Sequence, residues 1–267
     1  MATRRTISII TDYGQEGPFA GAMKGAILKL NPDVNIVDVT HAITPGNIRE
    51  AAFVLDTTYR YFPENSIHVV VVDPNVGSDR RGLLVSVEGH FFVGPDNGVF
   101  SYILAKEDVY AVMHLDQEHF FLNPLSHTFH GRDVFAPIAG WLSKGIESSR
   151  LGTPIEDPCK FDLPVPAQVG PKMWKGVVLY VDHFGNLVTN LTQEHLPLDE
   201  NGYPAFVKIL LGQGEVTRGR RYFTEFPERE PFLLLGSSGY YEIAVPNDSA
   251  ARVLGLKAGS AIGAIAR

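Results

Sequence analysis

One short stretch of sequence contains a carboxylate and, a few residues later, two guanidinium groups. Asp73 ends an apolar run and is followed by Pro74, and Arg80 and Arg81 come later in the same loop. A turn rich in Pro and Gly can fold the chain back so that the Asp73 carboxylate meets a guanidinium group. An ordinary connection between two strands, with both arginines in solvent, fits the same pattern, so the pattern alone leaves both interpretations open.

A second polar turn surrounds His130, within the stretch Thr128–Pro137. Gly131 lets the backbone approach a ligand closely, and histidine is the commonest general base, although a single histidine in a turn is more often structural. Asp133 is expected to be the N-cap of the helix that follows. His127 lies nearby, yet no further His, Cys or Asp pattern completes a metal site, so no metal is predicted.

The first strand-like run ends in Thr11–Gly14, which contains another carboxylate. Asp12 can accept hydrogen bonds from two adjacent hydroxyls, as in the binding of a ribose diol, or it can belong to a simple turn before a helix. The chain has neither the G-x-G-x-x-G nor the G-x-x-x-x-G-K-[ST] phosphate-binding pattern. A bound nucleoside is therefore expected to carry no phosphate chain.

Two loops of the second half carry groups that suit a nucleoside or an amino acid. In Asp182–Asn190, Phe184 can stack on a purine and the Asn186 amide can pair with its ring edge, although a hairpin turn explains the same residues. The stretch Gly236–Ala244 is rich in hydroxyls, and its backbone N–H groups can bind an anion such as an amino-acid carboxylate. An ordinary loop is the alternative there. The absence of a G-x-S-x-G pattern argues against a serine hydrolase.

The elements that must position these residues change character along the chain. Strand-like runs at 7–10, 34–39, 67–72, 83–87 and 90–93 are interspersed with helical patterns at 18–30, 47–61 and 133–144. This alternation predicts an N-terminal α/β domain with a central mostly parallel sheet and helices on both faces. Ligands of such sheets bind beyond the carboxyl ends of the strands, where Asp12, His41 and Asp73 lie.

Prolines interrupt the pattern at 163–171, and beyond them the runs are mostly strand-like, at 176–181, 187–191, 205–211, 231–235 and 240–245. A single helical pattern, at 248–254, follows. We therefore expect an N-terminal domain at 1–165, a linker at 166–174 and a smaller C-terminal β domain, a barrel or a sandwich, at 175–267.

The composition is that of a globular protein and excludes several classes. The chain has 267 residues, 45% of them hydrophobic, and a formal net charge of -7. No basic stretch offers a surface for nucleic acid. The apolar run near the start is broken by Asp12, too early for a signal peptide or a membrane span. The single cysteine, Cys159, suits a reducing compartment, so a cytoplasmic protein with no membrane partner is expected.

Taken together in order, these motifs resemble one family, the S-adenosyl-L-methionine (SAM) hydrolases that form adenosine, also called SAM hydroxide adenosyltransferases. They are relatives of the fluorinating and chlorinating enzymes. The motifs are Thr11–Gly14, Asp38–His41, Val72–Gly77 with Arg80 and Arg81, Gly94–Gly98, Thr128–Asp133, Asp182–Asn186 and Ser237–Ala244. Asn75 stands where the family usually has a second glycine, and Pro246-Asn247 replaces the usual Asn-Gly.

The resemblance implies an α/β domain followed by a C-terminal β-barrel-like domain. It also implies a homotrimer whose sites lie between subunits, and a reaction in which SAM and water give adenosine and methionine. Carried over by motif, the water-activating set is Asp73, Arg80 and His130. The substrate-binding set is Asp12 for the ribose, Phe184 and Asn186 for the adenine, Asp182 and Ser237 for the methionine, and in addition Glu242 and Val245.

The favoured SAM hydrolase function has several alternatives. The halogenating relatives replace the aspartate of the charged set by a neutral residue, and Asp73 is retained here, which favours water over halide. A halide transferase, a non-catalytic SAM or adenosine sensor, and a metal-dependent hydrolase remain as alternatives. SAM is the substrate of the favoured reaction, and no cofactor is expected.

Overall fold

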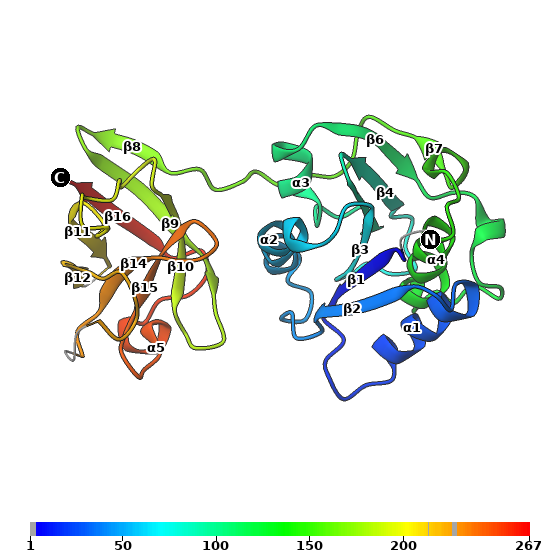
Figure 1. The fold of residues 1–267 in the computed structure, drawn as a ribbon, viewed down its shortest axis with the longest axis horizontal. Helices are drawn as coiled ribbons and strands as arrows, with labels where there is room; N and C mark the ends of the chain where they lie inside the picture. The colour runs from blue at the N-terminus through cyan, green and yellow to red at the C-terminus, as the bar shows by residue number, and fades with distance from the viewer. Residues whose placement is uncertain (1–3, 213, 226–228) are drawn as a thin grey trace. The chain divides into compact units, whose positions relative to one another are not determined.

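The computed structural model describes residues 4–212, 214–225 and 229–267 and divides the chain into two compact units, Met1–Asp162 and Leu163–Arg267 (Figure 1). Among these residues, no helix combines the length and the apolar character needed to cross a bilayer.

The first unit is built on a mixed β-sheet. Its strands are β1 (Thr6–Thr11), β2 (Asn35–Thr40), β3 (Ser66–Val71), β4 (Gly82–Val87), β5 (His90–Pro95), β6 (Val109–His114) and β7 (Thr153–Pro154). Within the described residues they lie in the order β2-β1-β3-β5-β4-β6-β7. The pairs β1/β2, β1/β3 and β3/β5 are parallel, and β4, β6 and β7 are added antiparallel. The predicted site residues Asp12 and Asp73 follow the parallel strands β1 and β3.

Helices cover both faces of this sheet, as the alternating pattern predicts (Figure 1). They are α1 (Phe19–Leu30), α2 (Ile48–Thr58), α3 (Ser101–Lys106) and α4 (Ala136–Ser143), with short helical turns η1 (Tyr59–Tyr61), η2 (Glu118–Phe120), η3 (Gly131–Phe135) and η4 (Ser148–Arg150). Successive β3 residues point to opposite faces, so Val69 packs in the core under α1 and α4 and Val70 in the core under α2 and α3. The predicted α/β fold class is confirmed.

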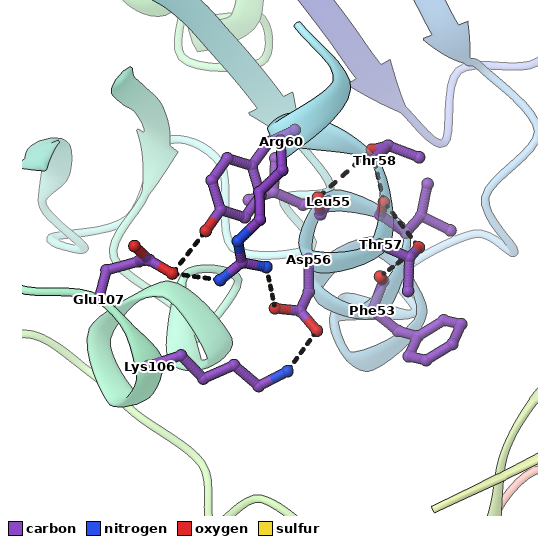
Figure 2. Close-up of polar contacts among 10 residues, drawn as sticks. Phe53, Leu55, Asp56, Thr57, Thr58, Arg60, Lys106 and Glu107 are labelled. Carbon is purple, nitrogen blue, oxygen red and sulfur yellow. Dashed lines mark hydrogen bonds and ion pairs between the residues drawn. The ribbon is translucent and has the colours of Figure 1, made fainter. Parts of the chain in front are cut away.

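A network of ion pairs and hydrogen bonds connects α2 and the η1 turn that follows it to the C-terminal end of α3, on one face of the sheet (Figure 2). The nearly buried Asp56 accepts a hydrogen bond from Lys106 at 2.6 Å, and Arg60 makes an ion pair with Glu107. The Tyr59 hydroxyl donates to Glu107 at 2.6 Å. Because both carboxylates are paired, the cluster keeps α2 and α3 docked without leaving a buried charge unmatched.

A polar row runs across three strands beneath this helical layer. Ser8 Oγ lies 2.7 Å from His68 Nδ1, and His68 Nε2 lies 3.1 Å from His90 Nδ1. His68 is 1% exposed and stacks on Phe92. Burial, together with the neighbouring His90, lowers the pKa of His68 from 6.5 to about 3. The folded protein therefore holds His68 uncharged.

This row predicts a loss of stability in acid. Because the folded-state pKa of His68 lies below its unfolded value, the unfolded chain binds more protons between these values, and stability falls as the pH drops from 6.5 towards 3. From pH 7 to about pH 4.5 we expect His68 to account for a loss of roughly 2–3 kcal/mol in the free energy of unfolding. Urea denaturation at both pH values should show a smaller loss in His68→Gln and an unchanged loss in His119→Gln, an exposed control. An equal loss in all three proteins would contradict the assignment.

The second unit is a barrel-like sheet whose described strand pairs are antiparallel except for the short parallel pair β13/β14. Its strands are β8 (Ala167–Gly170), β9 (Met173–Val181), β10 (Leu187–Thr192), β11 (Phe206–Leu211), β12 (Gly214–Val216), β13 (Arg218–Gly219), β14 (Phe232–Leu235), β15 (Tyr240–Ala244) and β16 (Ala261–Ala266). In the described part of the chain their order is β12-β11-β16-β9-β10-β15-β14-β13, and β8 pairs with β9. The helix α5 (Ala250–Leu254) begins at the Ser249 N-cap and ends at Gly255. The predicted β-barrel-like class is confirmed.

The segment 166–174, expected to be a linker, contains regular structure. It holds β8 and the first residues of β9, which pair antiparallel. The prolines lie outside the paired backbone, since Pro164 and Pro166 precede β8 and Pro171 sits in the turn after it. The passage between the two units therefore falls earlier, at Asp162 and Leu163.

Candidate active site

The loop after β3 carries Asp73 back towards another loop of the same unit. Gly77 in this loop has φ +82°, and a Cβ atom there would lie 2.1 Å from the carbonyl oxygen of His127. Only glycine permits both this conformation and this approach. The close contact holds the Asp73 loop against the segment that contains His130.

Arg80 bridges Asp73 and His130. Its Nε lies 3.0 Å from both carboxylate oxygens of Asp73, and its Nη2 lies 2.5 Å from Oδ2. The same Nη2 lies 2.8 Å from Nδ1 of His130. The side chains of Arg80 and Asp73 are 9% and 5% exposed, so their ion pair is largely shielded from water. The structure thus brings His130 together with Asp73 and Arg80 of a distant loop, while the chemical roles of the three residues stay predictions.

The contact with Arg80 determines which nitrogen of His130 carries the proton. A guanidinium group can only donate hydrogen bonds, so Nδ1 of His130 accepts, and the neutral ring carries its proton on Nε2. Burial, followed by the positive charge of Arg80, lowers the pKa of His130, while Asp73 acts in the opposite direction. His130 therefore presents an N–H donor at neutral pH.

The expectation that Asp133 caps the following helix is wrong. A π-helical turn, η3, begins at Gly131 with His130 at its N-cap, so Asp133 lies inside the turn. Its carboxylate is buried, where Oδ2 accepts the backbone N–H of Ser126 at 2.9 Å and Oδ1 the Nε of Arg132 at 2.6 Å. Asp133 thereby holds the loop that leads to His130. Such turns occur frequently at functional sites.

Asp12 and Tyr13 lie beyond the carboxyl end of β1, in the same unit. Oδ2 of Asp12 accepts the backbone N–H of Gly46 at 2.8 Å, which leaves its other oxygen for a ligand. The Tyr13 hydroxyl lies against Gly131, since a Cβ atom there would be 2.5 Å from it. Burial, and then the charges of Asp12 and Asp73, raise the pKa of Tyr13. The phenol therefore keeps its proton. Tyr13 is a polar neighbour of the Asp73, Arg80 and His130 cluster, and it was not among the predicted site residues.

The second unit contains a pocket of about 1100 Å³ that gathers the remaining predicted residues. Among its lining residues are Asp182, Phe184, Asn186, Ser237, Glu242 and Val245. They come from three places in the β domain: the loop after β9, the loop before β15, and β15 with the turn that follows it. Their convergence on one hollow supports their selection as a set, and their ligand contacts stay predictions.

Asp182 shapes one wall of this pocket from within. Its Oδ1 accepts the backbone N–H groups of Phe184 at 2.9 Å and Asn186 at 2.8 Å, and its Oδ2 accepts Nδ2 of Asn186 at 2.8 Å. Phe184 as a whole residue is left 76% exposed. At Gly185, with φ +85°, a Cβ atom would lie 2.1 Å from Oγ of Ser249, so the loop packs directly on the start of α5. Most of the bonding capacity of Asp182 thus serves the loop.

Glu242 lies on β15 and lines the same pocket. Burial, and then the charge of Asp182, raise the pKa of Glu242 to about 7. Val245 is 8% exposed, and its carbonyl accepts the N–H of Asp248 at 3.2 Å in a tight turn. Asn247 in this turn has φ +56°, a conformation that asparagine tolerates. The turn therefore forms without the glycine usual at this point.

Several pocket residues were not singled out from the sequence. They are Arg221, Tyr222, Phe223, Thr224, Asp248, Ser249 and Arg252. The adjacent aromatic residues Tyr222 and Phe223 are both about half exposed in a loop, and a pair of large aromatic residues outside any strand was the available signal. In the part of the chain that the structure describes, no group of three or more His, Cys, Asp or Glu residues is arranged to hold a metal ion.

Comparison with known families gives a match for each unit. Residues 7–152 match the SAM hydroxide adenosyltransferase N-terminal domain, and residues 176–263 match the C-terminal domain of the same family. The chain belongs to the SAM hydroxide adenosyltransferase family. Asn75, which departs from the family's usual glycine, is not among the described residues with positive φ, so the loop needs no glycine there.

Relatives within and near this family carry two kinds of name. Proteins named (R)-S-adenosyl-L-methionine hydrolase from Methanocaldococcus jannaschii and Thermus thermophilus are each 34% identical, over 93% and 96% of this chain and 91% and 97% of theirs. A fluorinase from an Actinoplanes species is 24% identical over 95% of both chains. A solved structure of a conserved protein from Thermotoga maritima covers 97% of this chain and 99% of its own, with TM-score 0.89 and 30% identity.

Proposed function

We propose that this SAM hydroxide adenosyltransferase hydrolyses SAM to adenosine and L-methionine by attack of water at C5'. The observation that carries the proposal is the cluster in which Arg80 joins the Asp73 carboxylate to His130. A halide needs a small, desolvated pocket, whereas a water molecule needs both acceptors and donors. The named hydrolases among the relatives support the same activity.

The chemistry of the leaving group explains what the site must supply. Attack of the water oxygen on C5' forms a C–O bond while the C5'–S bond breaks, and its electron pair goes to sulfur. The product methionine is a neutral thioether, so it needs no general acid and no metal to stabilise it. The difficulty lies in the weak nucleophile, which must be held in line with the C–S bond and lose a proton.

Each member of the cluster has a role that follows from its contacts. The Asp73 carboxylate accepts the water proton, since a carboxylate oxygen retains a lone pair beyond its bonds to Arg80. His130 donates its Nε2–H to the water oxygen and fixes the direction of attack. Arg80 orients both partners and compensates the negative charge of the developing hydroxide.

The remaining residues are proposed to bind the substrate. Asp12 accepts hydrogen bonds from the ribose diol through its free oxygen. Phe184 stacks on the adenine, and Asn186 pairs with the edge of the ring through its amide. The methionine portion contacts Asp182, Ser237 and Glu242, and Val245 lies beside the adenine.

Glu242 predicts a pH dependence of SAM binding. SAM carries a positive charge on its sulfonium and another on its ammonium group, so it favours the ionised form of Glu242. Because the pKa of Glu242 in the free protein is about 7, we expect the Kd for SAM to fall as the pH rises through 7, by about tenfold in all. Calorimetry at several pH values should show this trend in the wild type. It should disappear in Glu242→Gln and persist in Glu230→Gln, an exposed control; its persistence in Glu242→Gln would contradict the assignment.

We also propose a homotrimer with active sites between subunits, acting in the cytoplasm. The family resemblance supports the assembly, and the single cysteine suits a reducing compartment. Light scattering on the purified chain tests the assembly, with three times the chain mass as the expected result.

Product analysis tests the proposed function. Purified protein is incubated with SAM in a chloride buffer containing EDTA, beside a heat-killed control, and the mixture is separated by chromatography. Adenosine and methionine in equal amounts are expected. Chlorodeoxyadenosine would identify a halide transferase, intact SAM with saturable binding would identify a sensor, and activity that requires removal of EDTA would identify a metal-dependent hydrolase.

A further inference from the structure

A path of polar side chains links three elements of the first unit and ends beside Asp12. Nζ of Lys24 on α1 lies 2.5 Å from Oδ2 of Asp38 on β2, and the other oxygen of Asp38 lies 3.2 Å from Nε2 of His41. Nδ1 of His41 lies 2.8 Å from Oγ1 of Thr11, at the end of β1. We refer to the last three residues as the Thr11–His41–Asp38 relay. None of them has a role in the proposed chemistry.

The donors and acceptors of this relay form a consistent series. The backbone N–H of Tyr13 donates to the Thr11 hydroxyl at 3.2 Å. The Asp38 carboxylate, which can only accept, lies beside Nε2 of His41 and favours the tautomer with its proton on Nε2, although this contact is not aligned as a hydrogen bond. Nδ1 then accepts the proton of the Thr11 hydroxyl. Partial burial opposes ionisation of Asp38, but the hydrogen bond from Lys24 and the neighbouring His41 outweigh it and lower the pKa of Asp38.

The geometry of the relay resembles a nucleophile with its base, yet Thr11 cannot act as one. Its side chain is fully buried, and His41 is only 4% exposed. The hydroxyl therefore has no access to a substrate. Its surroundings indicate a structural purpose close to the site instead.

The relay holds both sides of Asp12. Thr11 and Tyr13, the residues before and after Asp12, meet at the Thr11 hydroxyl. The carbonyl of His41 accepts the N–H of Gly14 at 2.8 Å, and the loop that follows His41 supplies the Gly46 N–H to the Asp12 carboxylate. Loss of the bond between Thr11 and His41 would therefore loosen the turn that bears Asp12 and the loop that orients its carboxylate.

We propose that Thr11, His41 and Asp38 are positioning residues that aim the Asp12 carboxylate at the ribose diol of the substrate. This inference rests on the proposed function, in which Asp12 binds the diol. It predicts a specific loss, because a misdirected Asp12 weakens recognition of the two hydroxyls and leaves recognition of the adenine unchanged.

The test compares two ligands that differ only in the diol, adenosine and 2',3'-dideoxyadenosine. The full chain is titrated with each by calorimetry, in the wild type and in Thr11→Val, Thr11→Ser and Asp38→Asn. Valine has the shape of threonine without the hydroxyl, whereas serine keeps the hydroxyl. Asp33→Asn serves as the control, since the Asp33 side chain is 92% exposed outside the relay.

The wild type should bind adenosine roughly 10- to 100-fold more tightly than the dideoxy compound, as charge-assisted hydrogen bonds to two hydroxyls imply. Thr11→Val should reduce this ratio to about threefold or less, and Asp38→Asn should reduce it in the same direction. Thr11→Ser and Asp33→Asn should keep it.

An unchanged ratio in Thr11→Val would overturn the proposal, and so would an equal loss in Thr11→Ser. If Thr11→Val does not fold, Asp38→Asn decides, because Asp38 lies at the exposed end of the relay and an unchanged ratio there overturns it. A wild type that neither hydrolyses SAM nor binds adenosine would refute the proposed function itself and the inference with it. That outcome is recognised before any variant is compared.

Discussion

Asp73→Asn should lower kcat for SAM hydrolysis by about 10³-fold and change the affinity for SAM by no more than about threefold. The substitution keeps the size of the side chain and an acceptor for Arg80, but it removes the group that takes the water proton. Stopped assays with chromatography of adenosine give kcat, and calorimetry gives the Kd for SAM. Asp79→Asn, an exposed carboxylate of the same loop, is the matched control and should retain activity.

The same variant also tests the ion pair. Without Asp73 the Arg80 guanidinium, 9% exposed, loses its counter-charge, and we expect the free energy of unfolding to fall by about 1–3 kcal/mol. Thermal unfolding then shows whether Asp73→Asn is still folded at the assay temperature. A folded variant with wild-type kcat would rule out Asp73 as the acceptor of the water proton.

His130→Asn should lower kcat by about 10²-fold, because the water molecule loses the donor that directs it. The asparagine oxygen can replace Nδ1 as the acceptor for Arg80, but nothing replaces Nε2–H. His130→Gln extends an amide nitrogen towards the position of Nε2 and should recover part of the rate. His127→Asn, at an exposed histidine nearby, is the control.

The pH profile of the wild type follows from the same residue. The active form of His130 is neutral, and burial with the charge of Arg80 lowers its pKa. At saturating SAM, kcat should therefore be constant around neutral pH and fall only below pH 6.5, as the ring gains a proton on Nδ1 and is repelled by Arg80. The residual activity of His130→Asn should lack this acid limb. A limb that remains unchanged in His130→Asn would assign the titration to another group.

The elements with the strongest sequence patterns agree with the structure. The continuous β-branched run at 67–72 corresponds to β3, buried on both faces, and Asn47 is the N-cap of α2, with its side chain accepting from Glu50. Two strands, β6 and β16, were not predicted because their sequence patterns are weak. β6 is mostly half-buried at the antiparallel side of the sheet, and β16 is composed of small residues and single isoleucines. Neither alternates clearly enough to predict a strand.

The candidate site could be predicted as residue types but not as contacts. The pair Arg80-Arg81 is adjacent in sequence, yet Arg80 turns to Asp73 while Arg81 binds Asp96 at 2.7 Å and Asp157 at 2.8 Å. Which arginine meets the Asp73 carboxylate depends on the direction of the loop after β3. That direction is set by the close approach of Gly77 to the backbone of His127. The buried position of Asp133 could not be predicted either, because the π-helical turn places this residue inside the turn and not at the N-cap of a normal helix.

The central claim is that water attacks C5' of SAM, and hydrolysis in ¹⁸O-enriched water tests it most directly. Mass spectrometry of the products should find one heavy oxygen in adenosine, at the 5' position, and none introduced into methionine. Adenosine without the label, or a label in the amino-acid product, would place the broken bond elsewhere and contradict the role given to Asp73, Arg80 and His130.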